Sequence, residues 1–387
     1  MKKVLIVYAT AGEGHKRAAF SIKGAFDEMG AKDYEVQIVD SLDYTNAFFK
    51  WFYPRSYMFM VTYLPTLWGF FYYLLDIKRL YPFVKFTRRI VNKNHAKCFE
   101  EFLCGLQPDV IVSTHFLTNE VVSGLKERGL LNSKLITCVT DFRMHSFWFA
   151  KETDFFCVAF KETRDDLVKK WGFLEDKIKI LGIPIHPKFC RQKNKDEICQ
   201  RLNISKERFS VLVTGGGFGV GPIVGIVRSL VKTGLPMQIL VVCGHNNRLK
   251  EQLDQLSAIS AVGGSVSGGS HQLSAIKTFG FIDYMDELME VSQIGITKAG
   301  GLITSESITK GLPLIIIAPI PGQESRNCRL LLSNKAAFRI NNPAQVPKVI
   351  KQIFCDQAVL KQVRENIMRI KKDDPSTNIV KFVVSML

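Results

Sequence analysis

The feature that most constrains the fold is a strict alternation of short, β-branched apolar runs with longer segments of helical pattern. Most of the runs are continuously apolar, as expected for parallel strands that are covered on both faces. Strands that alternate with helices in this way predict doubly wound α/β sheets. The predicted strands form two series, 3–8, 35–39, 109–113, 135–140, 155–159 and 178–181, and then 210–214, 238–243, 276–279, 293–297 and 314–318.

The length of the chain and a break in this rhythm predict two domains. At 387 residues the chain exceeds one ordinary core, and its 47% of hydrophobic residues suffice for two. The rhythm breaks near 184–208, where Pro184, Pro187 and a charged stretch separate the two series. We therefore predict two α/β domains that face each other across a cleft. The predicted ranges are 1–190, 191–365 and a helical segment 366–387 that returns to the first domain.

One stretch of low complexity interrupts the second series. Residues 257–270 are dense in Gly and Ser, which bury too little apolar surface to fix a conformation. We predict a mobile loop there.

The charge and the cysteines restrict the partners and the chemistry. The formal net charge of +16 predicts an anionic partner, either nucleic acid or an acidic membrane surface. The nine cysteines contain no Cys-x-x-Cys pair, which is typical of reduced thiols in the cytosol. His186 and Cys190 lie four residues apart without further ligands nearby in sequence, so we predict no metal site.

An aromatic segment, 48–86, is the least ordinary stretch of the chain. Residues 56–75 carry no charged side chain and as a helix would be long enough to span a bilayer. Pro65 lies in the middle, however, and Tyr and Trp occur throughout instead of gathering at the two ends. We therefore do not predict a transmembrane helix.

A basic stretch follows this segment directly. Lys85, Arg89, Lys93 and Lys97 recur every four residues and would line one face of a helix. An aromatic surface beside a basic face is typical of a segment that lies in the membrane interface. A buried helical hairpin with a charged edge is one alternative, and nucleic-acid binding, for which no motif is present, is another. The predicted membrane contacts are Trp51, Phe52, Trp68, Phe70, Phe71, Lys85, Arg89 and Lys93.

A glycine-containing turn follows the first predicted strand. Gly12 and Gly14 let backbone N–H groups approach a ligand closely, and helical sequence begins at Lys16. His15 stands at the start of this helix, where the positive end of the helix dipole lowers the imidazole pKa. The position therefore predicts either a general base or a structural histidine.

The second series contains a comparable turn and two more candidate sites. The run 215–222 (GGGFGVGP) is a candidate diphosphate cradle, but it lacks the Gly-Lys-Ser/Thr ending of a P-loop, which argues against ATP chemistry. The helix predicted at 302–310 presents a second anion-binding amide end, and its Glu306 is placed to accept bonds from ribose hydroxyls. The polar turn 321–324 follows the strand 314–318, at the edge where open α/β sheets bind ligands.

Together these residues resemble a known family. Gly14-His15 with Ala18-Ala19, Gly215-Gly216-Gly217, Gly280-Phe281-Ile282, Thr297-Lys298-Ala299-Gly300, Glu306 and Ile320-Pro321-Gly322-Gln323-Glu324 with Asn327 occur in one order along the chain. This ordered set is similar to that of the monogalactosyl- and glucosyl-diacylglycerol synthases. These enzymes are a branch of the GT-B glycosyltransferases, which also include the lipid-linked N-acetylglucosaminyltransferase of peptidoglycan synthesis.

The resemblance implies a GT-B fold of two Rossmann-like domains, and it implies roles for individual residues. His15 is implied as the base, with Gly14, Asp141 and His145 on the acceptor side. The implied donor-binding residues are Gly216, Gly217, Phe281, Ile282, Met285, Lys298, Gly300, Thr304, Glu306, Gln323, Glu324 and Asn327. Among these, Ile282 and Met285 would hold uracil, and Gln323 and Glu324 would contact the sugar.

The sequence departs from the family at two positions. Phe218 stands where plant galactosyl enzymes have an acidic residue, which bears on the identity of the sugar. His186 replaces a usual arginine near the hinge between the domains.

These implications lead to one functional hypothesis. We expect inverting transfer of a hexose, with glucose favoured over galactose, from a UDP-sugar to diacylglycerol, without a metal or other cofactor. The expected location is the inner, cytoplasmic face of the cell membrane, bound peripherally to anionic lipids and not to nucleic acid. The alternatives are a polyprenyl-linked acceptor, a UDP-sugar epimerase or a non-catalytic, membrane-bound nucleotide-sugar sensor.

Overall fold

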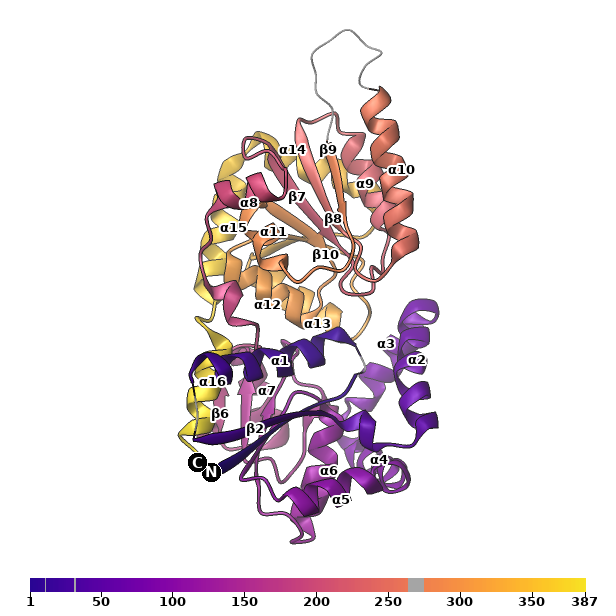
Figure 1. Ribbon diagram of the computed structural model, residues 1–387. Helices are drawn as coiled ribbons and strands as arrows, with labels where there is room; N and C mark the ends of the chain where they lie inside the picture. The colour runs from indigo at the N-terminus through magenta and orange to yellow at the C-terminus, as the bar shows by residue number, and fades with distance from the viewer. Residues whose placement is uncertain (11, 31–32, 264–274) are drawn as a thin grey trace. The chain divides into compact units, whose positions relative to one another are not determined.

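The computed structural model describes residues 1–10, 12–30, 33–263 and 275–387, and the side chains of 89–94 and 259–263 lie outside this description. The chain divides into two compact units (Figure 1). The first unit comprises Met1–Pro187, Ile320–Arg326 and Lys372–Leu387, and the second comprises Lys188–Pro319 and Asn327–Lys371.

The first unit is built on a parallel sheet of six strands in the order β2-β1-β3-β4-β5-β6. The strands are β1 (Lys2–Tyr8), β2 (Tyr34–Asp40), β3 (Val110–Ser113), β4 (Lys134–Cys138), β5 (Phe155–Val158) and β6 (Ile178–Ile180). The helices outside the aromatic segment are α1 (Glu13–Glu28), α5 (Lys97–Leu106), α6 (Phe116–Glu127), α7 (Lys161–Trp171) and α16 (Pro375–Val384).

Both faces of this sheet are buried, as the continuous apolar runs predict. Side chains of a strand alternate between the two faces. Val4 and Ile6 of β1 accordingly pack with α1 and α16 on one face, whereas Leu5 and Val7 pack with α5 and α6 on the other.

The second unit is built on a parallel sheet in the order β12-β11-β10-β7-β8-β9. Its strands are β7 (Phe209–Thr214), β8 (Met237–Val242), β9 (Ala275–Phe279), β10 (Ile294–Thr297), β11 (Leu314–Ile317) and β12 (Ala337–Ile340). Its helices are α8 (Lys195–Arg201), α9 (Ile223–Val231), α10 (Asn247–Gly263), α11 (Met285–Val291), α12 (Gly301–Lys310), α14 (Val346–Cys355) and α15 (Gln357–Ile370), and α13 (Gln323–Ser333) begins in the first unit and ends in the second.

The fold class is confirmed, and each predicted strand coincides with an observed one. The sequence reading missed β12. This strand lies at the edge of its sheet, and Arg339 is exposed in the middle of it, so that it lacks a continuous apolar run.

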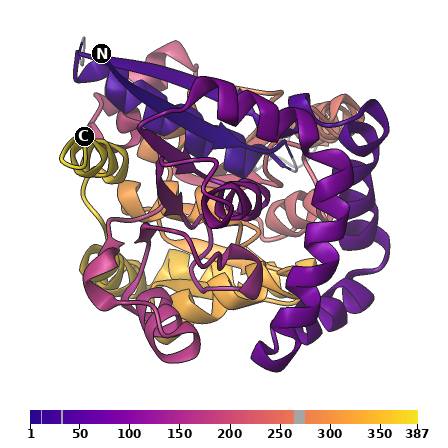
Figure 2. The same cartoon turned by 90° about the horizontal axis from the view of Figure 1, so that it is seen from below.

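The aromatic segment folds into helices α2 (Ala47–Tyr63), α3 (Pro65–Leu75) and α4 (Tyr81–His95). In the described part of the chain no single helix is long and apolar enough to cross a bilayer; α2 and α3 reach that length and composition only together, and they are bent by 114°. Pro65 begins α3, where its missing N–H is not needed. In both ribbon views the pair lies at the flank of the first unit remote from α16 (Figures 1 and 2).

Two local expectations were wrong. Lys97 does not continue the helical face of Lys85, because α4 ends at His95 and Lys97 begins α5. The predicted loop 257–270 begins as helix, because α10 extends to Gly263; residues 264–270 lie outside the described residues. Lys97 keeps the four-residue spacing of the basic residues, but this spacing does not reveal that one helix ends and another begins between Lys93 and Lys97.

Candidate active-site residues in the two units

The sheet order of the first unit identifies where a ligand would bind. The connections from β1 run in opposite directions to β2 on one side and β3 on the other. Open α/β sheets bind ligands at such a switch point, beyond the carboxyl ends of the strands. The first turn of α1, which follows β1, carries Gly14 and His15, and the turn after β3 carries Thr114 and His115. A Cβ atom at Gly14 would meet no atom within 4 Å, so the backbone there is open.

His15 is held in one tautomer by its neighbours. Its Nδ1 lies 2.7 Å from the backbone carbonyl oxygen of Thr114 and 3.1 Å from the hydroxyl of Thr140. A carbonyl oxygen only accepts, so Nδ1 carries the proton and Nε2 has a free lone pair. Burial lowers the pKa of His15 to about 4, although the ring keeps partial contact with solvent. His15 is therefore neutral near pH 7 and able to accept a proton at Nε2.

A second histidine, which sequence reasoning missed, lies beside His15. His115 is fully buried, and its ring contacts that of His15 edge to face at 4.6 Å between centroids. Its Nδ1 accepts the backbone N–H of Leu117 at 3.1 Å and so caps α6. The signal that could have revealed it is the polar run Ser113-Thr114-His115, which ends a buried strand.

The two further acceptor-side candidates, Asp141 and His145, differ in how many of their polar atoms bond within the fold. Its Oδ2 accepts the indole N–H of Trp148 at 3.1 Å, and the Trp148 ring lies 5.9 Å from that of His15. Burial raises the pKa of Asp141 to about 6. His145, by contrast, uses both ring nitrogens within the fold: Nε2 donates to the carbonyl of Tyr72 at 2.9 Å, and Nδ1 accepts from the amide of Phe147.

The switch point of the second unit lies between β7 and β10, and it carries the glycine-rich turn. This turn is folded closely onto the turn after β8. A Cβ atom at Gly219 would lie 2.2 Å from the carbonyl oxygen of Cys243, and one at Gly244 would lie 2.2 Å from that of Gly217. Gly216 has a φ of +78° and open space where a side chain would be. The glycines therefore permit this close folding and leave the backbone at Gly216 accessible.

The turn after β10 places a cation and a helix start beside the glycine-rich turn. The side chain of Lys298 lies against the glycine-rich turn: a Cβ atom at Gly221 would lie 3.5 Å from Cε of Lys298. Gly300 caps α12, whose first amides are available to an anion. The hydroxyl of Thr304 donates to the carbonyl of Gly300 at 2.6 Å, and Glu306 is buried in the same helix.

The predicted uracil-binding residues also lie at this end of the second unit. Ile282 and Met285 are buried, whereas Phe281 is half exposed and stacks on His245 with ring centroids 4.1 Å apart. Sequence reasoning missed His245. Asn327 donates its amide to the carbonyl of Ala299 at 2.9 Å, which fixes the turn after β10.

The two predicted sugar contacts belong to the first unit. Gln323 donates its amide N–H to the hydroxyl of Tyr57 in α2 at 2.7 Å. Glu324 accepts the backbone N–H of Ile320 at 2.9 Å and so holds the turn before α13.

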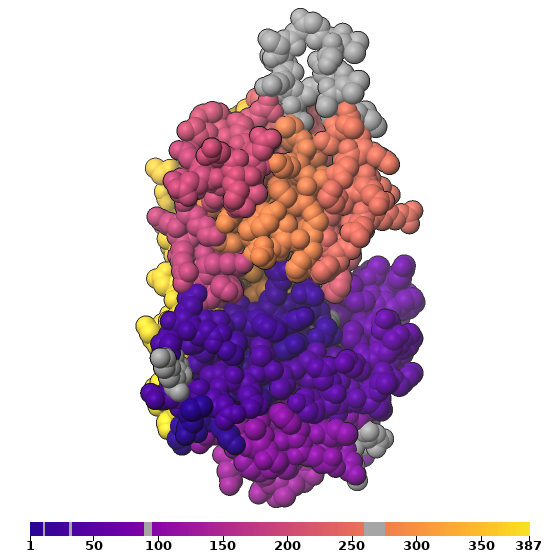
Figure 3. All heavy atoms as spheres, viewed as in Figure 1, coloured from indigo at the N-terminus to yellow at the C-terminus, as the bar shows by residue number. Residues whose placement is uncertain are grey.

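The predicted membrane contacts are mostly exposed. The side chains of Trp51, Phe52, Phe70 and Phe71 are 54%, 46%, 61% and 41% exposed. Space-filling spheres show residues of α2 and α3 at the surface of the first unit (Figure 3). Trp68 instead packs inward, edge to face on Tyr57 at 5.3 Å, and Lys85 pairs with Glu127 at 2.9 Å. The side chains of Arg89 and Lys93 lie outside the described residues.

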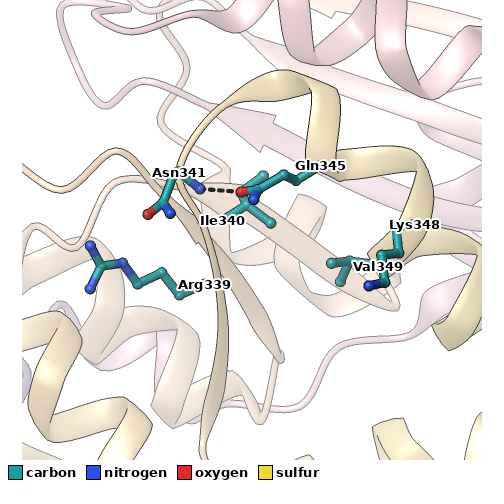
Figure 4. Close-up of a pocket in the computed structure, with 6 residues that line it drawn as sticks. All are labelled: Arg339, Ile340, Asn341, Gln345, Lys348 and Val349. Carbon is teal, nitrogen blue, oxygen red and sulfur yellow. Dashed lines mark hydrogen bonds between the residues drawn. The ribbon is translucent and has the colours of Figure 1, made fainter.

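Two hollows of the second unit do not coincide with the predicted donor residues. One, of about 510 Å³, lies where β12 ends and α14 begins, and Arg339 and Lys348 line it (Figure 4). The other, of about 270 Å³, lies between the start of α9 and α10 and touches the glycine-rich turn at Gly219 and Gly221. Among the described residues, three or more His, Cys, Asp or Glu side chains do not come together as a metal site would require.

Comparison with known proteins agrees with this geometry. Residues 15–185 match the family model of monogalactosyldiacylglycerol (MGDG) synthase, and residues 210–374 match that of the glycosyltransferase family 28 C-terminal domain. A probable chloroplastic monogalactosyldiacylglycerol synthase of Glycine max is 32% identical, over 98% of this chain and 70% of that protein. A processive diacylglycerol β-glucosyltransferase of Bacillus cytotoxicus is 28% identical, over 99% of this chain and 93% of that protein.

Solved structures show the same fold at low identity. The crystal structure of MurG from Acinetobacter baumannii matches with a TM-score of 0.58 and 13% identity, over all of both chains. The two family models together span both units, and the plant relative matches over nearly the whole chain. The chain therefore belongs to the monogalactosyldiacylglycerol synthase family of glycosyltransferases.

Proposed function

We propose that this protein transfers a hexose from a UDP-sugar to the free hydroxyl of diacylglycerol, with inversion at the anomeric carbon. The observation that carries the proposal is His15. It stands at the switch point of the first unit, is neutral near pH 7, and has its proton fixed on Nδ1 by the carbonyl of Thr114. This leaves Nε2 as the proton acceptor that an attacking hydroxyl requires.

The proposed reaction uses one proton acceptor and a set of groups that stabilise the leaving diphosphate. His15 Nε2 takes the proton of the lipid hydroxyl as the lipid oxygen bonds to the anomeric carbon. The bond from that carbon to UDP breaks on the opposite face, and UDP leaves with the electron pair. The amides at Gly216 and at the start of α12, with the ammonium of Lys298, would stabilise the diphosphate charge that develops. No step calls for a metal.

The exposed aromatic side chains of α2 and α3 support a membrane-bound enzyme. Large exposed aromatics beside basic residues are typical of interfacial segments, and the net charge of +16 favours an anionic leaflet. The nine cysteines all lie in the described part of the chain and form no disulfide, as is typical of cytoplasmic proteins. We therefore propose peripheral binding to the cytoplasmic face of the cell membrane.

We propose glucose as the preferred hexose. The support is the departure from the family resemblance at Phe218 in the glycine-rich turn: its side chain is 43% exposed, and the resemblance implies an acidic residue there in plant galactosyl enzymes.

The test is a transfer assay on anionic liposomes that contain diacylglycerol, with labelled UDP-glucose and UDP-galactose in parallel. We expect labelled glycolipid, formed faster from UDP-glucose. His15→Ala should lose at least about 100-fold in kcat while its Kd for UDP stays within about twofold. UDP binding without any labelled lipid would refute the assignment of diacylglycerol as acceptor, and activity that survives in His15→Ala would refute the base.

A further inference from the structure

The segment Ile320–Arg326, which consists of a turn and the first residues of α13, lies against helices α2 and α3 within the first unit. Pro321 packs on Gly69 of α3 so closely that a Cβ atom at Gly69 would lie 2.5 Å from the Cβ of Pro321. Gly322 has a φ of +105° and lies against the Tyr72 ring. A Cβ atom at Gly322 would lie 3.0 Å from Cγ of Tyr72. The inner side of the aromatic helices is therefore shaped to fit this turn.

An ion pair anchors the end of this segment that lies in α13. The guanidinium of Arg326 donates to Asp76 at 2.7 Å and to the carbonyl of Met144 at 2.9 Å, and it lies over the Tyr72 ring at 5.0 Å. Asp76 is itself held by the backbone N–H of Ser146 at 2.7 Å. These contacts fix the turn relative to the end of α3.

Among the described residues, one hydrogen bond orients the side chain of Gln323. Its amide nitrogen donates to the Tyr57 hydroxyl at 2.7 Å, and the Tyr57 ring is braced edge to face by Trp68. The amide oxygen of Gln323 is buried and accepts no hydrogen bond from the described residues. A buried acceptor without a donor is unfavourable, so this oxygen is suited to the hydroxyl of a ligand.

We propose that Tyr57 is a positioning residue for hexose recognition. By holding the amide nitrogen of Gln323, it directs the amide oxygen toward one hydroxyl of the donor hexose. Helices α2 and α3 then have two roles, an exposed aromatic face and an inner face that supports the sugar subsite. This inference rests on the proposed function, because Gln323 meets a sugar only if the donor is a UDP-hexose.

The test compares the binding of UDP-glucose, UDP-galactose and UDP to the full chain by titration calorimetry. Tyr57→Phe keeps the ring against Trp68 and removes only the hydroxyl. We expect the Kd for the preferred UDP-hexose to rise by about tenfold, the value for one lost hydrogen bond, and the Kd for UDP to stay within about twofold. Tyr63→Phe is the matched control, because Tyr63 lies on the same helix and is 71% exposed; it should leave all three constants unchanged.

A double-mutant cycle separates positioning from general structural damage. If Tyr57 acts through Gln323, then Tyr57→Phe should have no further effect on hexose binding in a Gln323→Leu background. Gly69→Ala adds an independent test, because its new methyl group must displace Pro321. This substitution should weaken the binding of UDP-hexose more than the binding of UDP. Gly124→Ala in α6 is its control, because a Cβ atom there meets nothing within 4 Å.

The outcomes distinguish this inference from the proposed function. The role of Tyr57 would be overturned if Tyr57→Phe raised the Kd values for UDP-hexose and UDP equally, or raised neither. Additive effects of the two substitutions in the double-mutant cycle would also overturn it. None of these measurements needs an acceptor, so a failure of diacylglycerol transfer leaves them intact. A wild-type protein that binds UDP-hexose no more tightly than UDP would overturn the sugar subsite itself.

Discussion

Acidification is predicted to destabilise the first unit, because three of its histidines have lowered pKa values and are neutral in the folded state. Burial lowers the pKa of His15 and of His145 to about 4, and it lowers that of His115 well below the ordinary value. In the unfolded chain the imidazoles of His15 and His145 take up a proton near pH 6.5, whereas in the folded protein they bind it only near pH 4. The stability these groups contribute is therefore full above pH 6.5 and falls as the pH decreases through this window.

The magnitude follows from the lowered pKa values of His15 and His145 and from one group, Asp141, that opposes them. From about pH 7 to about pH 5, a histidine whose pKa falls from 6.5 to about 4 on folding loses about 1.8 kcal/mol of stabilisation. Asp141 opposes this, because its pKa is raised to about 6 and the folded state gains about 1.3 kcal/mol on protonation. With His15 and His145 both counted, the net loss is about 2 kcal/mol. His115 adds to it with the same sign.

The assay is urea unfolding followed by tryptophan fluorescence at the two pH values. All four tryptophans lie in the first unit, so the signal reports that unit. The free energy of unfolding should be lower by about 2 kcal/mol or more at about pH 5. His145→Gln removes one titrating group and should reduce this difference by about 1.8 kcal/mol. Equal stability at both pH values, or an unchanged difference in His145→Gln, would refute the reasoning.

Three further predictions concern activity and binding. Because the pKa of His15 is lowered to about 4, kcat/KM should stay level from about pH 7.5 to about pH 5.5 and fall only below that; an acidic limb near pH 6.5 would contradict the assignment. Gly244→Ala should raise the Kd for UDP by about tenfold or more, because its Cβ would lie 2.2 Å from a carbonyl of the glycine-rich turn. Gly234→Ala, which has a similar positive φ but nothing within 4 Å, should leave that Kd unchanged; equal effects would exclude the contact as the cause. Phe70→Ser should reduce co-sedimentation with anionic liposomes by several-fold without changing UDP affinity, whereas Leu174→Ser, equally exposed at 61%, should not; identical binding of both variants would argue against the aromatic face.

Sequence predicts the fold here because parallel strands covered on both faces leave a continuous apolar pattern. The edge strand β12 was not predicted, because it exposes Arg339 in its middle and so lacks a continuous apolar run. Lys97 was misplaced because a helical spacing persists across the break at Ala96, where one helix ends and another starts. A periodicity reports which side chains would share a face, and it does not report whether the backbone between them is continuous.

The candidate site was predictable where a residue follows a glycine-containing turn, as His15 does. His115 and Tyr57 were not predictable, because each gains its role from a partner far away in sequence. His115 meets His15 from another strand end, and Tyr57 meets Gln323 from a different region of the chain. His145 shows the converse, since the family resemblance implied an acceptor-side role, whereas both of its ring nitrogens are hydrogen-bonded within the fold.

The packing of α16 has a consequence for how the protein is made. Ile379, Val380 and Val383 are fully buried against Val4 and Ile22, yet the ribosome produces them only after the whole of the second unit. The unit that is synthesised first is therefore completed last, and until then the nascent chain exposes an apolar face that chaperones would have to shield. A fragment that stops at residue 187 keeps this exposed face, whereas a construction that joins 372–387 to it by a flexible linker would restore the missing helix.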